Sequence, residues 1–170
     1  DTPALFTTAH GETVQLYGQG LYRYDSLLIG SGYRGQDLVV LVVGLPLLVI
    51  ALLFYWRQSL RGGLLLTGVL AFILYYGVSM VFGAAYNALF LAYIALYSVS
   101  FFTFVLAFAA IDRETLPSAC APALPHRSIA IFLFVIGVVL CVVWLGLSLA
   151  PAIRQGQPPV ELSHYTTLLT

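Results

Sequence analysis

The polar side chains that chemistry would need lie in an N-terminal region, residues 1–36, and at a turn around Asn87. Asn87 is the only carboxamide in the uncharged stretch 63–111. Because an amide beside lipid must find hydrogen-bond partners, Asn87 either caps the helix that follows it or binds a ligand. A ligand site there would include Tyr86. Three charged residues that precede the long apolar runs would cover it on the outer side: Arg23, Asp25 and Asp37.

Tyrosines recur with helical spacing on both sides of this turn. Tyr75, Tyr76 and Tyr86 share one face of the predicted helix before the turn, and Tyr93 and Tyr97 share one face of the predicted helix after it. One interpretation is close packing of two helices, with phenols forming hydrogen bonds across the interface. The other is a pocket for a neutral amphiphile such as a quinone or a lipid, in which the rings stack on the ligand and the hydroxyls bind it.

Metal and catalytic motifs are absent from the sequence. The histidines and glutamates outside the apolar runs do not have zinc-site spacing: His10, Glu12, Glu161 and His164. Hydrolase, zinc-protease, phosphate-loop and dinucleotide fingerprints are missing as well. We therefore predict no catalytic residue, no metal and no cofactor, and the sequence favours a protein that is not an enzyme without deciding the question.

The composition assigns the chain to the membrane. It is 61% hydrophobic and 8% charged, whereas soluble domains have roughly 45–50% apolar and about 25% charged residues. The formal net charge is zero, so no basic surface predicts a nucleic-acid partner. The expected partners are the lipid bilayer and other membrane proteins or copies of the same chain.

Four apolar runs predict an all-α, polytopic membrane helical bundle with transmembrane helices at about 37–56, 64–86, 88–111 and 128–149. The stretch 63–111 would be about twice as long as the hydrocarbon core if it formed one helix, so it must turn near Asn87. Asp37 is placed to cap the first helix, Pro46 to kink it, and Pro151 to end the fourth. The transmembrane domain is thus expected at 37–149, followed by a tail at 150–170.

Residues 1–36 are expected to form a small cap outside the bilayer. Runs 13–17 and 21–25 flank Gly18 and Gly20, which predicts a β-hairpin, and the glycines at 30–35 indicate a flexible loop. Tyr22, Tyr24 and Tyr33 would lie at the headgroup level. The alternative is a ligand-binding lid formed by four charged residues: Arg23, Asp25, Arg34 and Asp37.

Arginines mark one side of the predicted membrane. Arg57 and Arg61 follow the first run, and Arg113 and Arg127 lie in the loop before the fourth, whereas the turn near Asn87 has no basic residue. The positive-inside rule then places both Arg-containing loops in the cytoplasm. Both ends of the sequence are therefore expected outside a bacterial inner membrane.

Ionisable residues are missing from the predicted spans, apart from a capping Asp37. Proton relays and ion-coupled carriers usually need such groups inside the membrane. We therefore predict a structural or accessory subunit that packs in a larger membrane complex or a homo-oligomer. The alternative is a carrier or binder of a neutral, lipid-like or quinone-like molecule, and the third is an enzyme with an extracytoplasmic site.

Three segments, 21–26, 35–38 and 83–91, together resemble uncharacterised multi-pass bacterial membrane proteins. The resemblance covers most of the first two-thirds of the chain. It implies a helical bundle with further helices beyond a segment like Tyr165-Thr-Thr167. It implies no activity, cofactor or catalytic residue.

Overall fold

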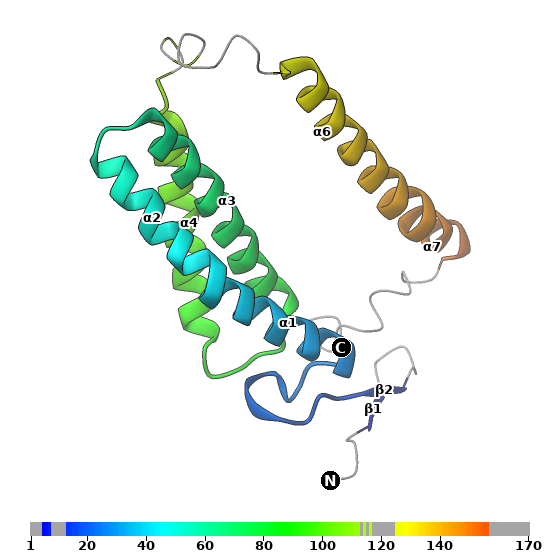
Figure 1. The fold of residues 1–170 in the computed structure, drawn as a ribbon. Helices are drawn as coiled ribbons and strands as arrows, with labels where there is room; N and C mark the ends of the chain where they lie inside the picture. Colours follow the sequence, from blue (N-terminus) through cyan, green and yellow to red (C-terminus); the bar gives the residue numbers. More distant parts are fainter. Residues whose placement is uncertain (1–4, 8–12, 113, 115, 117–124, 157–170) are drawn as a thin grey trace. The chain divides into compact units, whose positions relative to one another are not determined.

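The computed structural model describes residues 5–7, 13–112, 114, 116 and 125–156 (Figure 1). The chain divides into two units, of which the first contains residues 1–113 and 165–170 and the second contains residues 114–164. The predicted tail, the loop before the last helix and the residues considered as metal ligands, His10, Glu12, Glu161 and His164, lie mostly or wholly outside the described residues.

Helices dominate both units, and four of them are long and apolar enough to cross a membrane. Their bounds are Leu27–Trp56, Leu60–Gly83, Phe90–Ala109 and His126–Gln155. The prediction of a mostly helical chain with four such helices is therefore confirmed. The bounds of the first and last helices differ most from the prediction.

The first long helix begins ten residues before its predicted start, so the predicted flexible loop at 30–35 and the predicted cap at Asp37 are wrong. It comprises α1 (Leu27–Val39), a π-helical segment (Val40–Gly44) and α2 (Leu45–Trp56). Ser26 is the N-cap, and its hydroxyl oxygen accepts a hydrogen bond from the Ile29 N–H at 3.3 Å. A Cβ on Gly30 would lie 2.9 Å from Cβ of Tyr17, so this glycine permits close packing rather than flexibility.

Both prolines inside the apolar runs follow π-helical segments, and neither ends its helix. Pro46 comes two residues after the end of the segment Val40–Gly44, and the Leu45 N–H between them bonds to the Val40 carbonyl. Pro151 follows the π-helical segment Val142–Leu149, which joins α6 (His126–Cys141) to α7 (Ala150–Gln155). A π-helical turn is wider and shifts the backbone hydrogen-bond pattern, so a residue without an N–H is tolerated next to it. The predicted stop at Pro151 is therefore wrong.

The N-terminal region contains a β-ribbon and a 3-10 turn. Strands β1 (Leu5–Thr7) and β2 (Thr13–Gln15) pair antiparallel, with Phe6 opposite Val14. The run 21–25 is not a strand, because the chain forms a 3-10 helix at Gly20–Tyr22, so the second strand of the predicted hairpin is absent. The chain on either side of this 3-10 helix is joined by an isolated antiparallel bridge between Leu16 and Ser26, and the Tyr17 N–H bonds to the Asp25 carbonyl at 2.8 Å.

Helices α3 (Leu60–Gly83) and α4 (Phe90–Ala109) form an antiparallel hairpin, and α1–α2 packs against α3 in the same unit (Figure 1). The connection occupies residues 84–89 and is longer than predicted. Glycines bring the helices together: a Cβ on Gly77 would lie 3.1 Å from Cα of Tyr97, and one on Gly62 would lie 2.5 Å from the Phe54 carbonyl carbon. A second contact layer is apolar and contains Ala51, Leu66 and Leu70.

We predict that Gly62→Ala destabilises the first unit by about 1–3 kcal/mol, because its methyl group would overlap the backbone of α2. Gly63→Ala is the matched control, since a Cβ there meets no atom within 4 Å and alanine favours helix. Thermal unfolding in one detergent measures both variants. Equal unfolding temperatures for the two variants would contradict this packing.

Candidate functional site

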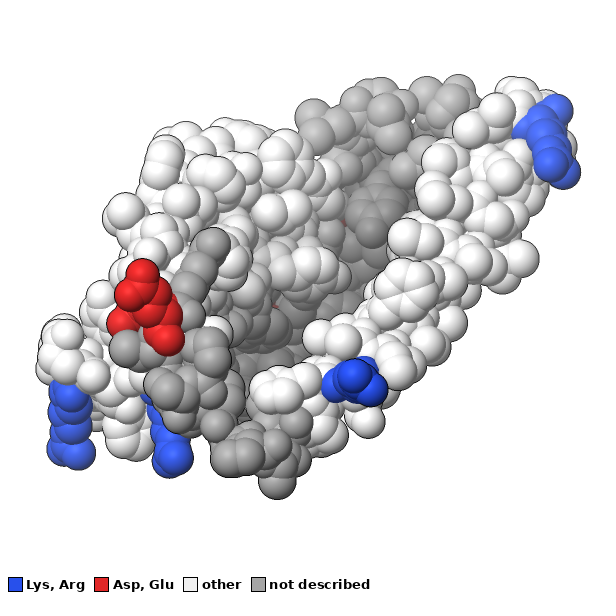
Figure 2. Space-filling view, turned by 90° about the horizontal axis from the view of Figure 1, so that it is seen from above, with Lys and Arg blue, Asp and Glu red and all other residues white. Residues whose placement is uncertain are grey.

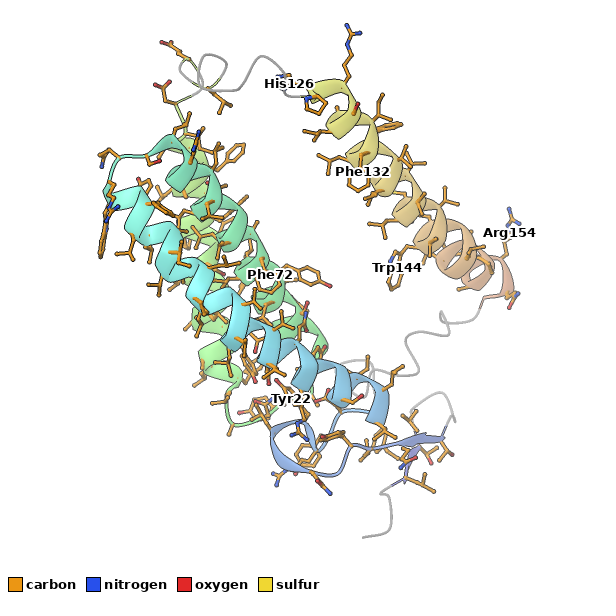
Figure 3. All side chains as sticks on the ribbon, in the orientation of Figure 1. Tyr22, Phe72, His126, Phe132, Trp144 and Arg154 are labelled. Carbon is orange, nitrogen blue, oxygen red and sulfur yellow. The ribbon has the colours of Figure 1, made fainter. Side chains whose placement is uncertain are left out.

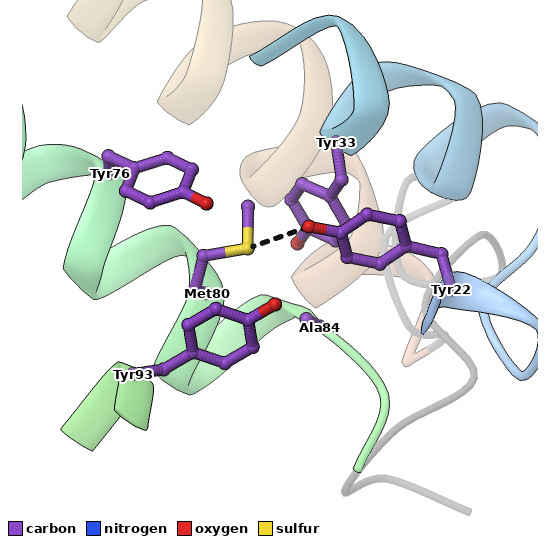
Figure 4. Close-up of a cluster of buried hydrophobic side chains, with 6 residues drawn as sticks. All are labelled: Tyr22, Tyr33, Tyr76, Met80, Ala84 and Tyr93. Atoms are coloured by element: carbon purple, nitrogen blue, oxygen red, sulfur yellow. Dashed lines mark hydrogen bonds between the residues drawn. The ribbon is translucent and has the colours of Figure 1, made fainter. Parts of the chain in front are cut away.

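A cluster of tyrosines lies where the N-terminal region meets the ends of the helices (Figure 4). We call it the tyrosine cluster, and its buried members are Tyr22, Tyr33, Tyr76, Met80, Ala84 and Tyr93. They come from the 3-10 turn, α1, the end of α3 and its cap, and α4. The N-terminal region and α1 thus share one core with the hairpin of α3 and α4.

Tyr22 occupies the centre of the tyrosine cluster. Its side chain is 2% exposed, and its ring lies 5.4 Å from that of Tyr33, measured between centroids. The hydroxyl group donates to Oδ2 of Asp37 at 2.8 Å and lies 3.7 Å from Sδ of Met80. Burial, followed by the contacts with Tyr93 and Asp37, raises the pKa of the Tyr22 phenol far above its ordinary range. Tyr22 is therefore a proton-bearing donor at every physiological pH.

Asp37 joins three elements through its carboxylate. Tyr22 from the 3-10 turn donates to Oδ2, and Tyr76 from α3 donates to Oδ1 at 2.6 Å. Asp37 itself lies in α1, inside the first long apolar helix and not at its cap. Both oxygens of the half-buried carboxylate are therefore used in holding the N-terminal region and α3 together.

Asp25 is the more deeply buried carboxyl group, with 1% of its surface exposed. Oδ1 accepts a hydrogen bond from the Ala85 N–H at 2.8 Å, which ties the loop before α1 to the turn after α3. Among the described residues, Oδ2 has no hydrogen-bond partner. Burial raises the pKa of Asp25, and the bond from Ala85 acts in the opposite direction.

Asn87 uses its amide within the turn between α3 and α4. Oδ1 accepts from the Leu89 N–H at 2.9 Å, and Nδ2 donates to the Ala85 carbonyl at 3.2 Å. This Asx turn precedes the first residue of α4, Phe90, and supplies hydrogen-bond partners to the partly buried side chain. The geometry favours the structural interpretation of Asn87, and its ligand-binding role stays a prediction.

The predicted ligand residues do not all meet. Asp25, Asp37, Tyr76 and Tyr93 lie in or against the tyrosine cluster. The others lie elsewhere: Tyr75 is 63% exposed and Tyr86 is 75% exposed. Arg23 lies over the Tyr24 ring, and Tyr97 packs against Phe82 and Phe101.

Sequence reasoning placed Tyr22 and Tyr33 at the headgroup level and did not include Met80 in any site. The signal for Met80 was its place one helical turn after Tyr76, since residues four apart share a face. Tyr22 had no such signal, because its position depends on a 3-10 turn in a region without regular periodicity.

No described cation neutralises the two buried or half-buried carboxyl groups. Arg34 bonds to the Tyr17 hydroxyl, Arg23 lies 4.6 Å from the centroid of the Tyr24 ring, and neither pairs with Asp25 or Asp37. Within the described ranges, no three His, Cys, Asp or Glu side chains come together as a metal site would require. No protein-family model, curated protein or solved structure matches the chain.

We predict that Tyr76→Phe destabilises the first unit by about 1–3 kcal/mol, because Oδ1 of Asp37 would lose its donor while remaining partly buried. Tyr75→Phe is the matched control: it removes the same atom from a side chain that is 63% exposed. Unfolding temperatures in one detergent compare the two. Equal effects would show that the Tyr76 hydroxyl contributes nothing beyond an exposed phenol.

Proposed function

We propose that the chain is an integral membrane subunit with a structural or accessory role, packing against other membrane proteins or copies of itself. The proposal rests on one observation, which is that the polar side chains of the candidate site contact other parts of the same chain. Asp37 accepts hydrogen bonds from two phenols, and the Asn87 amide forms its hydrogen bonds within its own turn. Asp25 is buried. The surface that remains for contact with a partner is therefore mainly the apolar surface of the helices.

The described surface supports this proposal. Figure 2 shows charged side chains at a few separate places on an otherwise uncharged face. In α6–α7, Phe132 and Trp144 project from the helix between His126 and Arg154 (Figure 3). This helix is the only long one described in its unit, so lipid, the first unit or another chain must cover its apolar side chains.

Small residues on the helix surfaces favour contact with another helix. A Cβ on Gly63 or Gly68 in α3, or on Gly137 in α6, would meet no atom within 4 Å. Membrane helices associate by close backbone approach at such positions, because lipid removes the hydrophobic drive that operates in water. Lipid contact alone would not require glycine there.

The proposed topology follows from helix length and arginine position. The 30 residues of Leu27–Trp56 extend about 45 Å, whereas the hydrocarbon core is about 30 Å thick. The 19 peptide steps from Asp37 to Trp56 cover about 28 Å, so the start of α1 would extend beyond the core with Arg34. Arg57 and Arg61 would lie on the cytoplasmic side, and the N-terminal region outside.

A second candidate function, binding of a neutral lipid-like or quinone-like molecule, is favoured by one feature. The exposed ring of Tyr86 lies 5.2 Å from that of Phe90, measured between centroids, on the turn between α3 and α4. Such a pair supplies a stacking surface at the end of the helix hairpin. Asn87 is adjacent, although its amide is already bonded.

We predict that native mass spectrometry of the full chain from mild detergent or nanodiscs shows retained subunits, either copies of the chain or other membrane proteins. Gly68→Leu should reduce their occupancy, because a large side chain would fill an open position on α3. Gly32→Leu is the control: its position is equally open but lies on the start of α1. A folded wild-type monomer without partners in both media would refute the subunit role, and retained lipid or quinone would favour the second candidate.

A further inference from the structure

We call the contacts of Asp25 and Asp37 that hold the N-terminal region on the ends of α3 and α4 the N-terminal clamp. The two aspartates differ in burial and in the number of hydrogen bonds that they accept. Asp37 is half-buried, and each of its oxygens accepts a hydrogen bond from a phenol. Asp25 is 1% exposed and receives a single N–H, and its Oδ2 has no partner among the described residues.

Each element that packs at the tyrosine cluster contributes titratable groups. The 3-10 turn supplies Tyr22, α1 supplies Tyr33 and Asp37, α3 supplies Tyr76, and α4 supplies Tyr93. Tyr93 lies within electrostatic range of both aspartates. Arg23 and Arg34 are exposed and engage Tyr24 and Tyr17 instead. Among the described residues, these elements therefore bring phenols and the carboxylate of Asp37 to the tyrosine cluster, and no cation.

An ionised Asp25 would be expensive in this setting. A buried charge without a counter-ion is strongly unfavourable even after relaxation of the surroundings. A neutral carboxylic acid avoids this cost and still accepts the Ala85 N–H through its carbonyl oxygen. The unpartnered Oδ2 is the atom that would carry the proton.

We propose that Asp25 is a proton-binding site, in which the folded chain holds one proton on this side chain at neutral pH, and that loss of this proton loosens the N-terminal clamp. The proton sits on Oδ2. Ionised Asp25 must regain water, so the loop before α1 separates from the turn at Ala85. The N-terminal region thereby becomes sensitive to the pH on its side of the membrane.

The direction of the pH effect follows from the raised pKa of Asp25. The folded state holds a proton that the unfolded chain releases near pH 4, so the stability it contributes is complete below about pH 4 and is lost as the pH rises through the folded value. We predict that the unfolding temperature of the wild type falls by about 3–5 °C for each pH unit within that window. Asp25→Asn should remove this slope, because the amide does not titrate and still presents an oxygen to Ala85.

Infrared spectroscopy tests the proton directly on the full chain in detergent. At neutral pH the wild type should show the carbonyl stretch of a protonated carboxylic acid, which an ionised carboxylate lacks. Asp25→Asn should lose this band and Asp37→Asn should keep it. A wild-type spectrum without the band, or a band that only Asp37→Asn removes, would overturn the proposal.

Two further measurements keep the test decisive if Asp25→Asn does not fold. In the wild type, the band should disappear on raising the pH, together with increased hydrogen exchange in residues 13–26. Exchange that stays constant while the band disappears would refute the link to the N-terminal clamp. An unfolding temperature that rises with sodium ion at constant pH and ionic strength, with no acid band, would show that a metal cation occupies the site instead.

Discussion

Two phenols converge on the carboxylate of Asp37, and the position of the N-terminal region on the helices depends on this junction. Tyr22 reaches it from a 3-10 turn and Tyr76 from α3, so one side chain of α1 joins segments that are distant in sequence. Hydrogen bonds to a partly buried carboxylate are stronger than those between neutral groups. Removing the carboxylate would leave two phenols without an acceptor in an apolar core, and the aromatic packing around Met80 depends on their direction.

The helices themselves could be predicted because hydropathy and length alone determine them. Runs of about twenty apolar residues need no tertiary information to be recognised as helices of membrane-spanning length. Helix ends are different, since they depend on single contacts. Ser26 starts the first helix ten residues early, and the glycines that suggest a loop at 30–35 instead permit the contact between Gly30 and Tyr17. The sequence does not distinguish a glycine that is required for close packing from one that makes the backbone flexible.

Prolines were misinterpreted for a related reason. Pro151 was expected to end its helix, yet the π-helical segment Val142–Leu149 widens the preceding turns and the helix continues to Gln155. Pro46 follows a similar segment. The cost of a missing N–H depends on the local hydrogen-bond register, which the sequence does not show. The end of the helix is marked instead by Gly156, whose φ of +63° is the left-handed conformation that glycine adopts easily.

The candidate site could be predicted only in part, because helical spacing groups residues by angle and not by contact. Tyr75 and Tyr76 were assigned to one face, whereas one is exposed and the other is buried against Asp37. The argument against ionisable chemistry in the spans also assumed that Asp37 capped a helix. Because Asp37 lies within the first long helix, that argument fails for this end of the chain. The carboxyl groups of Asp37 and Asp25 join the N-terminal region to α3 and to the turn after it, so buried polar contacts define this end of the chain and helical spacing does not.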